Sequence, residues 1–437
     1  MNPSGRLLTI LFVFTVAILT TARAQLSVQW VTQYGSSGAD VPNALTVDGL
    51  GQIWVTGYST GSLGGANAGI SDVFLSRLSP AGSVNFTRQR GGTGSDVGRG
   101  VAVVGSGTVF ISGVTGSSFD GTVPMDAYDN FTMRYDVSGN WQGTTRAGSN
   151  ASDQAQGVAG NATHLLAAGY SDGSFDSQIN QGSHDAFLSK RDSTGALVWT
   201  RFAGTSGEDF GQGAAFDSAG NAYLAGKTFS SFAGFSHVWS GDIFVARYDS
   251  AGNRTLLTEF GTLGDDNAAD VKVDASGNIY IAGYTHGPFG GYDSLLLKFN
   301  SAGTLLWTRY LGGSADDESK GLGLDSTGHV WIGGYSSSTF GGHVNAGNSD
   351  AFVAEYDTDG NLLGTTFLAT SAQDTISGLA MGQDGAAYVT GYTSGALAGT
   401  NAGDVDVFVA KIVPEPCATL LLTGSWLLCL ARRRRCC

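Results

Sequence analysis

A unit of about 56 residues recurs seven times between the two ends of this 437-residue chain. Three positions mark every copy. The first is a glycine in an apolar stretch, at Gly57, Gly113, Gly169, Gly226, Gly283, Gly334 and Gly391. The second is an aspartate that begins the next apolar stretch, at Asp72, Asp129, Asp185, Asp242, Asp293, Asp350 and Asp406. The third is an aspartate at Asp40, Asp96, Asp153, Asp209, Asp266, Asp317 and Asp374. Short units of this kind bury their faces by stacking, so we expect a closed ring.

Each unit predicts four β-strands, as the fifth copy illustrates. Residues 270–274 form a short apolar strand, and residues 279–284 form a second one that is rich in β-branched and aromatic residues. A third strand at 293–299 and a fourth at 305–309 follow. Tight turns with Asp, Asn and Gly separate strands. Because no segment of the repeat region has a helical period, the sequence predicts an all-β fold with four antiparallel strands per unit.

The ends of the array indicate how the ring closes. The last copy stops after its third strand, residues 405–412, and an unassigned strand at 26–32 precedes the first copy. Trp30 in that strand lies five residues before a glycine, as Trp199 and Trp307 do in the fourth strands of complete units. We therefore predict that the N-terminal strand completes the last blade, which leaves no long sheet edge free.

The units resemble the bacterial seven-bladed β-propeller repeat known as SBBP. The matching run is clearest at residues 204–209, 217–221, 223–226, 242–249 and 252–253. The resemblance covers roughly residues 26–412. It implies a seven-bladed β-propeller, and it implies almost nothing about activity.

The first 24 residues are typical of a secretory signal peptide. Arg6 supplies the positive start, residues 7–20 are apolar, and Ala22 and Ala24 form a small-x-small cleavage site. The alternative is a membrane anchor, for which the apolar run is short. We expect export through the Sec pathway.

The C-terminal tail has three parts. Pro414, Glu415 and Pro416 come first, an apolar run at 418–431 follows, and the tail then carries Arg432, Arg433, Arg434 and Arg435. This layout resembles the PEP-CTERM sorting signal, which implies recognition of Pro-Glu-Pro by an exosortase, a membrane protease-transferase. The apolar run would contact the membrane transiently, with the arginines on the cytoplasmic side. An ordinary unprocessed anchor is the alternative. All four cysteines lie in this tail, so its lipidation is left open.

The chain therefore divides into a signal peptide at 1–24, a propeller at 25–412 and a sorting tail at 413–437. The formal charge is −14, and six of the 23 basic residues lie in the two terminal segments. Because phosphate contacts require Lys and Arg, so acidic a propeller is not expected to bind nucleic acid. With no cysteine, the propeller must be held by packing and ring closure instead of disulfides.

The sequence gives no recognisable catalytic, cofactor or metal site. The aspartates that repeat in every copy, such as Asp40, are expected to accept backbone hydrogen bonds in the loop before each first strand. Residues 357–361 open like a calcium loop but lack its closing Glu. The six histidines fall in different copies without i,i+4 pairing, so we expect scattered surface residues and not a zinc site. No nucleophile elbow or phosphate loop is present.

One register breaks the repeat. Three residues after the third marker the chain is polar in six of seven copies but varies in identity, and the fifth copy has Ala269 there. The polar members are Asn43, Arg99, Gln156, Gln212, Lys320 and Ser377. Because the resemblance implies that the first strand is innermost, we predict that they ring the mouth of the channel as candidate ligand contacts. The alternative is a solvated strand end.

These features favour a non-catalytic binding or scaffold protein of the bacterial envelope, cell surface or extracellular matrix. Its expected partners are the sorting machinery and a polysaccharide or protein outside the cell. Two alternatives stay open. One is a propeller enzyme of the glycosidase, lyase or quinone-dependent type with its site at the channel mouth. The other is a purely structural surface protein.

Overall fold

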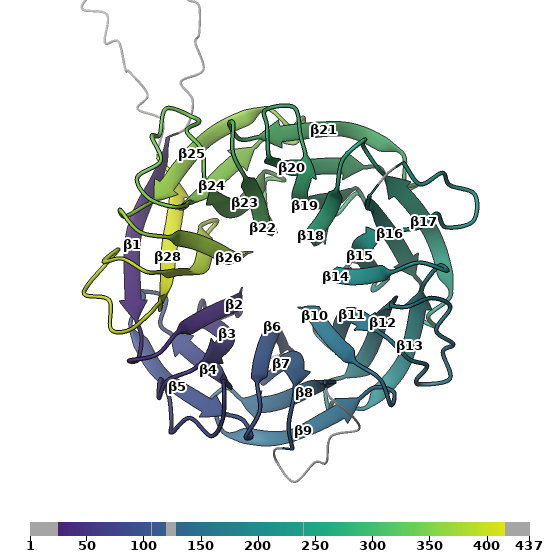
Figure 1. Ribbon diagram of the computed structural model, residues 1–437, viewed down its shortest axis with the longest axis horizontal. Helices are drawn as coiled ribbons and strands as arrows, with labels where there is room; N and C mark the ends of the chain where they lie inside the picture. The colour runs from purple at the N-terminus through teal and green to yellow at the C-terminus, as the bar shows by residue number, and fades with distance from the viewer. Residues whose placement is uncertain (1–24, 106, 119–127, 239, 416–437) are drawn as a thin grey trace, which may run out of the picture.

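The computed structural model describes residues 25–105, 107–118, 128–238 and 240–415. Within these residues, 28 strands form seven four-stranded antiparallel sheets, which stand as blades around a central axis (Figure 1). The predicted all-β, seven-bladed propeller is thus confirmed. The described part of the chain contains no helix with the length and apolar character needed to cross a membrane.

The strands lie in four concentric positions. The innermost strands are β2 (Asp40–Val47), β6 (Asp96–Val104), β10 (Asp153–Gly160), β14 (Asp209–Phe216), β18 (Asp266–Val273), β22 (Asp317–Leu324) and β26 (Asp374–Met381). The second strands are β3 (Ile53–Ser59), β7 (Thr108–Thr115), β11 (His164–Ser171), β15 (Ala222–Thr228), β19 (Ile279–His286), β23 (Val330–Ser336) and β27 (Ala387–Thr393). We number the blades 1 to 7 in this order.

The outer half of each blade consists of a buried third strand and a more exposed outermost strand. The third strands are β4 (Asp72–Leu78), β8 (Asp129–Asp136), β12 (Asp185–Asp192), β16 (Asp242–Tyr248), β20 (Tyr292–Phe299), β24 (Asp350–Tyr356) and β28 (Asp406–Pro414). The outermost strands of blades 1 to 6 are β5 (Val84–Arg90), β9 (Trp141–Ala147), β13 (Leu197–Ala203), β17 (Arg254–Phe260), β21 (Leu305–Leu311) and β25 (Leu362–Leu368).

The two ends of the described chain meet in blade 7. Its sheet has the order β1-β28-β27-β26, with β1 (Leu26–Tyr34) as the outermost strand. β1 runs antiparallel to β28, from the pair Leu26–Pro414 to the pair Tyr34–Val407. Figure 1 shows the purple first strand beside the yellow last one. The predicted closure is confirmed, and no blade is left with only three strands.

The hydrophobic core lies between neighbouring blades. Tyr223 and Val245 of blade 4, for example, pack in one buried cluster with Val271 and Ile281 of blade 5. Backbone hydrogen bonds add to this packing, because the N–H of Asp96 in blade 2 donates to the carbonyl of Ser71 in blade 1 at 2.9 Å. Each fully buried aliphatic side chain contributes about 1.5–3 kcal/mol, so the seven interfaces together hold the ring without disulfides.

The innermost strands begin earlier than the sequence predicts. In blade 5 the expected strand was 270–274, but β18 spans Asp266–Val273. The reason is a β-bulge between Ala268 and Asp270, which interrupts the alternation of side chains and hides the first half of the strand. At the other end, β28 continues beyond the predicted limit of residue 412 to Pro414 because it pairs with β1.

Candidate functional site

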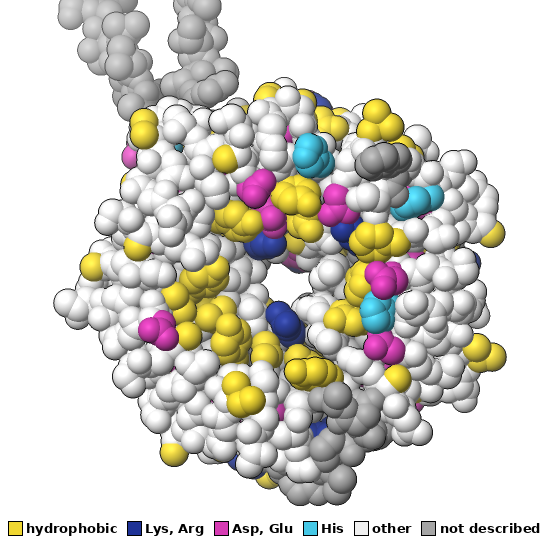
Figure 2. All heavy atoms as spheres, in the orientation of Figure 1, with side chains coloured by type: hydrophobic (Ala, Val, Ile, Leu, Met, Phe, Trp, Pro, Cys, Tyr) yellow, Lys and Arg dark blue, Asp and Glu magenta, His cyan; other side chains and the backbone are white. Residues whose placement is uncertain are grey.

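The innermost strands surround a central channel with a volume of about 820 Å³. Figure 2 shows its opening, around which side chains of the hydrophobic class, which includes tyrosine, gather together with basic and acidic ones. A concave site of this size, lined by a few polar groups, is a common place for ligands on a repeat fold.

Every innermost strand carries a β-bulge at the same place. The ladder between the first and second strands of each blade skips one residue, which is left without a partner. The skipped residues are the register singled out from the sequence: Asn43, Arg99, Gln156, Gln212, Ala269, Lys320 and Ser377. All seven line the channel. Because a bulge re-aims its extra side chain, the repeat builds a ring of seven channel-facing positions, and ligand contact by this ring stays a prediction.

The bulge also explains the glycine that marks the second strand of every unit. A Cβ on Gly57 would lie 1.9 Å from the carbonyl oxygen of Val41, the second residue before the bulged position. The same construction gives 1.8–2.0 Å in the other six blades. Only glycine permits so close an approach of the two backbones. The bulge therefore requires the repeated glycine, and so does the orientation of the ring residue toward the channel.

Lys320 is the ring residue with the most partners. Its Nζ lies 2.6 Å from Oε2 of Glu318 and close to the rings of Tyr284 and Tyr335, at 5.6 and 5.8 Å from their centroids. The ion pair and the two cation–π contacts fix the ammonium group at the channel wall. The two tyrosines belong to different blades, so Lys320 joins blades 5 and 6 at the channel.

Arg99 is in the opposite situation. Its Nε is buried and has no hydrogen-bond acceptor among the described residues. Burial lowers the pKa of Arg99 below its ordinary value, while nearby Tyr170 and Tyr58 oppose the shift. A buried donor without an acceptor is costly, so the guanidinium of Arg99 is held at some expense in the wall of the channel.

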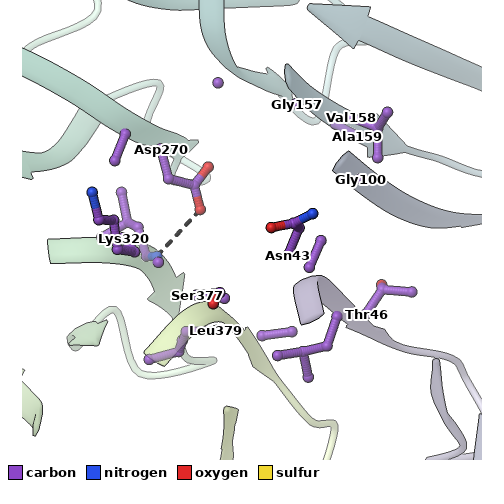
Figure 3. A pocket seen from close by; sticks show the side chains of 18 of the residues that line it. Asn43, Thr46, Gly100, Gly157, Val158, Ala159, Asp270, Lys320, Ser377 and Leu379 are labelled. Carbon is purple, nitrogen blue, oxygen red and sulfur yellow. Dashed lines mark hydrogen bonds between the residues drawn. The ribbon is translucent and has the colours of Figure 1, made fainter. Parts of the chain in front are cut away.

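Two further polar groups extend into the channel. Figure 3 shows Asn43 and Asp270 pointing into the space between the inner strands. The side-chain amide of Asn43 donates to the carbonyl of Gly98 in the next blade at 2.7 Å. Asp270 follows a bulge, where five other blades have glycine, and it accepts a 3.2 Å hydrogen bond from the N–H of Leu322. These contacts link adjacent inner strands, and both carboxylate oxygens of Asp270 also accept hydrogen bonds from Nζ of Lys272 in the same channel.

Two tyrosines of one repeated position, Tyr335 and Tyr392, line the channel, and the sequence analysis did not single them out. The residue after each repeated glycine lies next to the bulge, and it is Tyr58, Val114, Tyr170, Lys227, Tyr284, Tyr335 and Tyr392 in the seven blades. The five tyrosines are half-buried. Burial raises the pKa of Tyr284 and Tyr335. The sequence signal that could have identified this position is a tyrosine that follows the invariant glycine in five of the seven copies.

The aspartates of the third marker are structural, as predicted. Oδ2 of Asp209 accepts the backbone N–H of Thr205 at 2.6 Å, and Asp96 accepts that of Gly92 at 2.6 Å. The same bond, from the residue four positions earlier, occurs in all seven blades. One detail was wrong, since these aspartates begin the innermost strands and do not lie in the preceding loop.

The structure describes only a small part of the two terminal segments. Ala22, Ala24, Pro416 and the arginines at 432–435 lie outside the described residues. Pro414 ends β28, and the N–H of Glu415 donates to the carbonyl of Gln25 at 2.7 Å. The first two residues of the Pro-Glu-Pro element are therefore attached to the rim of blade 7, beside the first described residue of the chain.

The histidines are not all isolated. His184 contacts Asp172, and its Nε2 lies 3.9 Å from Glu208. His329 lies between Asp325 and Glu355. His329 is the one histidine within a possible metal-ligand group of three among the described residues, and the expected absence of a zinc site stays a prediction.

Comparisons with known proteins agree with the repeat. Residues 29–64, 198–233 and 255–290 match the SBBP β-propeller repeat family. The chain is 27% identical to the regulatory protein FlaEY of Caulobacter vibrioides over 91% of its own length, and it spans 46% of that protein. The chain thus covers about half of the curated relative that it matches.

Two solved structures have a similar shape. A protein of unknown function from Dyadobacter fermentans gives a TM-score of 0.49 at 10% identity, over 89% of this chain and 99% of that one. The extracellular domain of a putative one-component system from B. thetaiotaomicron gives 0.44 at 12% identity, over 88% and 40%. At these TM-scores neither likeness bears on function.

Proposed function

Starting from a β-propeller that carries SBBP repeats, we propose that the chain is a non-catalytic binding protein of the bacterial cell exterior, which holds a glycan at the mouth of its channel. One observation carries the proposal: seven equivalent bulges direct side chains of six different kinds into one channel. Structural positions repeat in this chain, whereas this one varies, as positions that contact an asymmetric ligand do.

The chemistry of the channel favours a sugar. A pyranose ring offers C–H groups to an aromatic face and hydroxyl groups to amides and charged donors. The half-buried Tyr335 and Tyr392, which line the channel, supply aromatic surface. Gln156 and Gln212 line the same channel with amides that both donate and accept hydrogen bonds, and Arg99 adds a donor without an acceptor.

The binding test compares two double variants that remove the same charge. Arg99→Ala with Lys320→Ala removes two basic groups of the ring. Arg88→Ala with Arg254→Ala removes two exposed basic groups of the outer strands β5 and β17. A glycan array identifies a binding oligosaccharide, and titration calorimetry then measures its affinity for each protein.

We expect the ring variant to weaken binding by roughly 100-fold, because each charged hydrogen bond is worth about 1.5 kcal/mol or more and 1.4 kcal/mol is tenfold. The control variant, Arg88→Ala with Arg254→Ala, should change the affinity less than about twofold. Equal affinity for both variants would remove the channel from consideration, and a turnover product in place of a bound sugar would favour the enzyme alternative.

We further propose that the protein is exported and sorted through its tail by exosortase-type machinery. The support is the order of Pro-Glu-Pro, apolar run and arginine cluster, together with the attachment of Pro414 to the rim of blade 7, which places the propeller directly beside the motif. Export fits a propeller without cysteines.

Intact mass and cell fractionation in the native host test the sorting. The wild type should begin near Gln25, lack the arginine cluster and be surface-exposed or released. A variant with Pro414→Ala, Glu415→Ala and Pro416→Ala should keep the tail and stay in the inner membrane. A full-length tail in both proteins would mean an ordinary anchor.

A further inference from the structure

A charge reversal distinguishes blade 6 from the other six. Five residues after the aspartate that marks the third strand, the other blades have a basic residue, namely Arg77, Arg134, Lys190, Arg247, Lys298 and Lys411. Blade 6 has Glu355 at this position. In a chain whose structural positions repeat so regularly, an inverted charge requires its own explanation.

Four of the six basic residues, Arg77, Arg134, Arg247 and Lys298, have a structural task that is missing in blade 6. The guanidinium of Arg77 donates to the carbonyl of Val137 at 2.9 Å, and Nζ of Lys298 donates to that of Thr358 at 2.8 Å. Both acceptors lie in the turn between the third and outermost strands of the next blade. Blade 7 has no such turn, because its outermost strand is the N-terminal β1. A base is therefore not needed in blade 6, but the absence of that need does not explain a buried acid.

Glu355 is in an environment that does not suit an isolated carboxylate. Its side chain is only 2% exposed, and Oε2 is buried without a hydrogen-bond partner among the described residues. Oε1 lies 2.7 Å from Nδ1 of His329. Burial raises the pKa of Glu355, an effect that His329 opposes. On β25 the residue opposite is Gly364, so no side chain from that strand fills the space beside Glu355.

His329 and Asp325 come from one tight turn that holds them in place. Oδ1 of Asp325 accepts the N–H groups of Thr327 and His329, at 2.8 and 3.0 Å. This fixes the carboxylate and leaves Oδ2 at 3.8 Å from Nδ1 of His329. Blades 4 and 5 build the same turn with Asp217 and Asp274, but there Asn221 and Asn278 replace the histidine. The histidine and the acid thus both depart from the repeat in one blade.

We propose that Asp325, His329 and Glu355 form a divalent metal site suited to zinc, a site that is independent of the channel. One ligand atom from each residue lies within 4.8 Å of the other two. Tetrahedral zinc with bonds of about 2.0–2.1 Å separates its ligand atoms by roughly 3.3 Å, and the observed separations of 2.7 and 3.8 Å bracket this value.

Metal binding requires little rearrangement. His329 would bind the ion through Nδ1 in its neutral form, with the single ring proton on Nε2. One oxygen from each carboxylate completes three protein ligands, and the divalent charge offsets the cost of burying Glu355. The 34% exposure of the His329 side chain leaves a solvent path for a water molecule as fourth ligand.

The test is a zinc titration of the full chain after removal of metals with a chelator and alkylation of its four thiols. Calorimetry should show one tight equivalent in the wild type. His329→Asn, which restores the turn residue of blades 4 and 5, should abolish it or weaken it beyond the roughly 10–100-fold that loss of an outer-shell partner costs. Glu355→Lys, which restores the basic residue of the other blades, should do the same.

Two controls make the result decisive. His184→Asn removes the other histidine that contacts two acids, and it should leave the tight equivalent unchanged. Asn278→His with Lys298→Glu transfers the pattern to blade 5, which already has Asp274, and it should add a second equivalent. Zinc binding that is absent in the wild type, or that survives His329→Asn at unchanged affinity, would overturn the proposal.

Discussion

The carbonyl oxygen of Phe210 lies only 1.9 Å from the position that a Cβ on Gly226 would take, which is too close for any side chain. The contact lies beside the bulge at Gln212, so the first and second strands of blade 4 approach each other closely where a side chain is sent into the channel. The same pair of features recurs in every blade. The invariant glycine of the repeat and the variable channel position at the bulge are therefore parts of the same structural feature.

Gly226→Ala should destabilise the propeller by about 2 kcal/mol or more, because the new Cβ must displace the backbone of β14. Urea unfolding followed by circular dichroism measures the loss. Gly107→Ala is the matched control, since nothing lies within 4 Å of a Cβ there. Equal stabilities of the two variants would mean that the bulge relaxes freely and that the glycine repeats for another reason.

The architecture was predictable because its signals are local and are repeated seven times. The orphan strand could be assigned from Trp30 alone, since its spacing to the next glycine matches complete blades, and the structure pairs it with Lys411 of β28. The register of the channel residues could be found because identity varies there against a constant background. The sequence of a single short strand is compatible with more than one secondary structure, but seven copies with the same pattern support one assignment.

Other features could not be predicted because they depend on geometry. The bulge disturbs the alternation of side chains, so the first half of each innermost strand was assigned to a loop. The tyrosines that follow the repeated glycines were predicted only as strand residues, because nothing in the sequence tells which face of the second strand meets the channel. His329 and Glu355 lie 26 residues apart, and only the pairing of β23 with β24 brings them together.

Ring closure through β1 should contribute strongly to stability. Leu26 is 4% exposed and packs in the buried cluster between blades 6 and 7, so Leu26→Ala should cost about 2–5 kcal/mol. Leu50→Ala removes the same atoms from a turn where the side chain is 82% exposed, and it should be nearly neutral. Denaturant unfolding of both variants measures the difference. A neutral Leu26→Ala would show that the ring does not depend on its N-terminal strand.

Mild acid should stabilise the folded propeller. Burial raises the pKa of Asp96, Asp209 and Asp266 above the usual carboxyl value of 3.8. The folded state therefore binds protons more tightly than the unfolded state at these sites. As the pH falls through the raised pKa values towards 3.8, the free energy of unfolding should rise.

The turn aspartates act in the opposite direction at lower pH. Hydrogen bonds from Asn253 and Asn140 lower the pKa of Asp249 and Asp136, so the stability from these groups is lost as the pH falls below 3.8. We expect a maximum on the acid side of neutrality, measured by urea midpoints between about pH 3 and 8. A steady decline from pH 7 to 4 would contradict it, and Asp266→Asn should reduce the rise.

Blocking the channel should separate binding from stability. Ala269 is the one ring residue without a polar side chain, and its bulge directs it into the channel. Ala269→Trp should fill part of the 820 Å³ space and abolish glycan binding. The free energy of unfolding should stay within about 0.5 kcal/mol of the wild type, because the new ring enters open space. Ala302→Trp, in an exposed turn on the rim, adds the same group and should leave binding intact. If Ala269→Trp binds the glycan normally, the ligand site lies elsewhere on the disc, and the ring of bulges serves the fold alone.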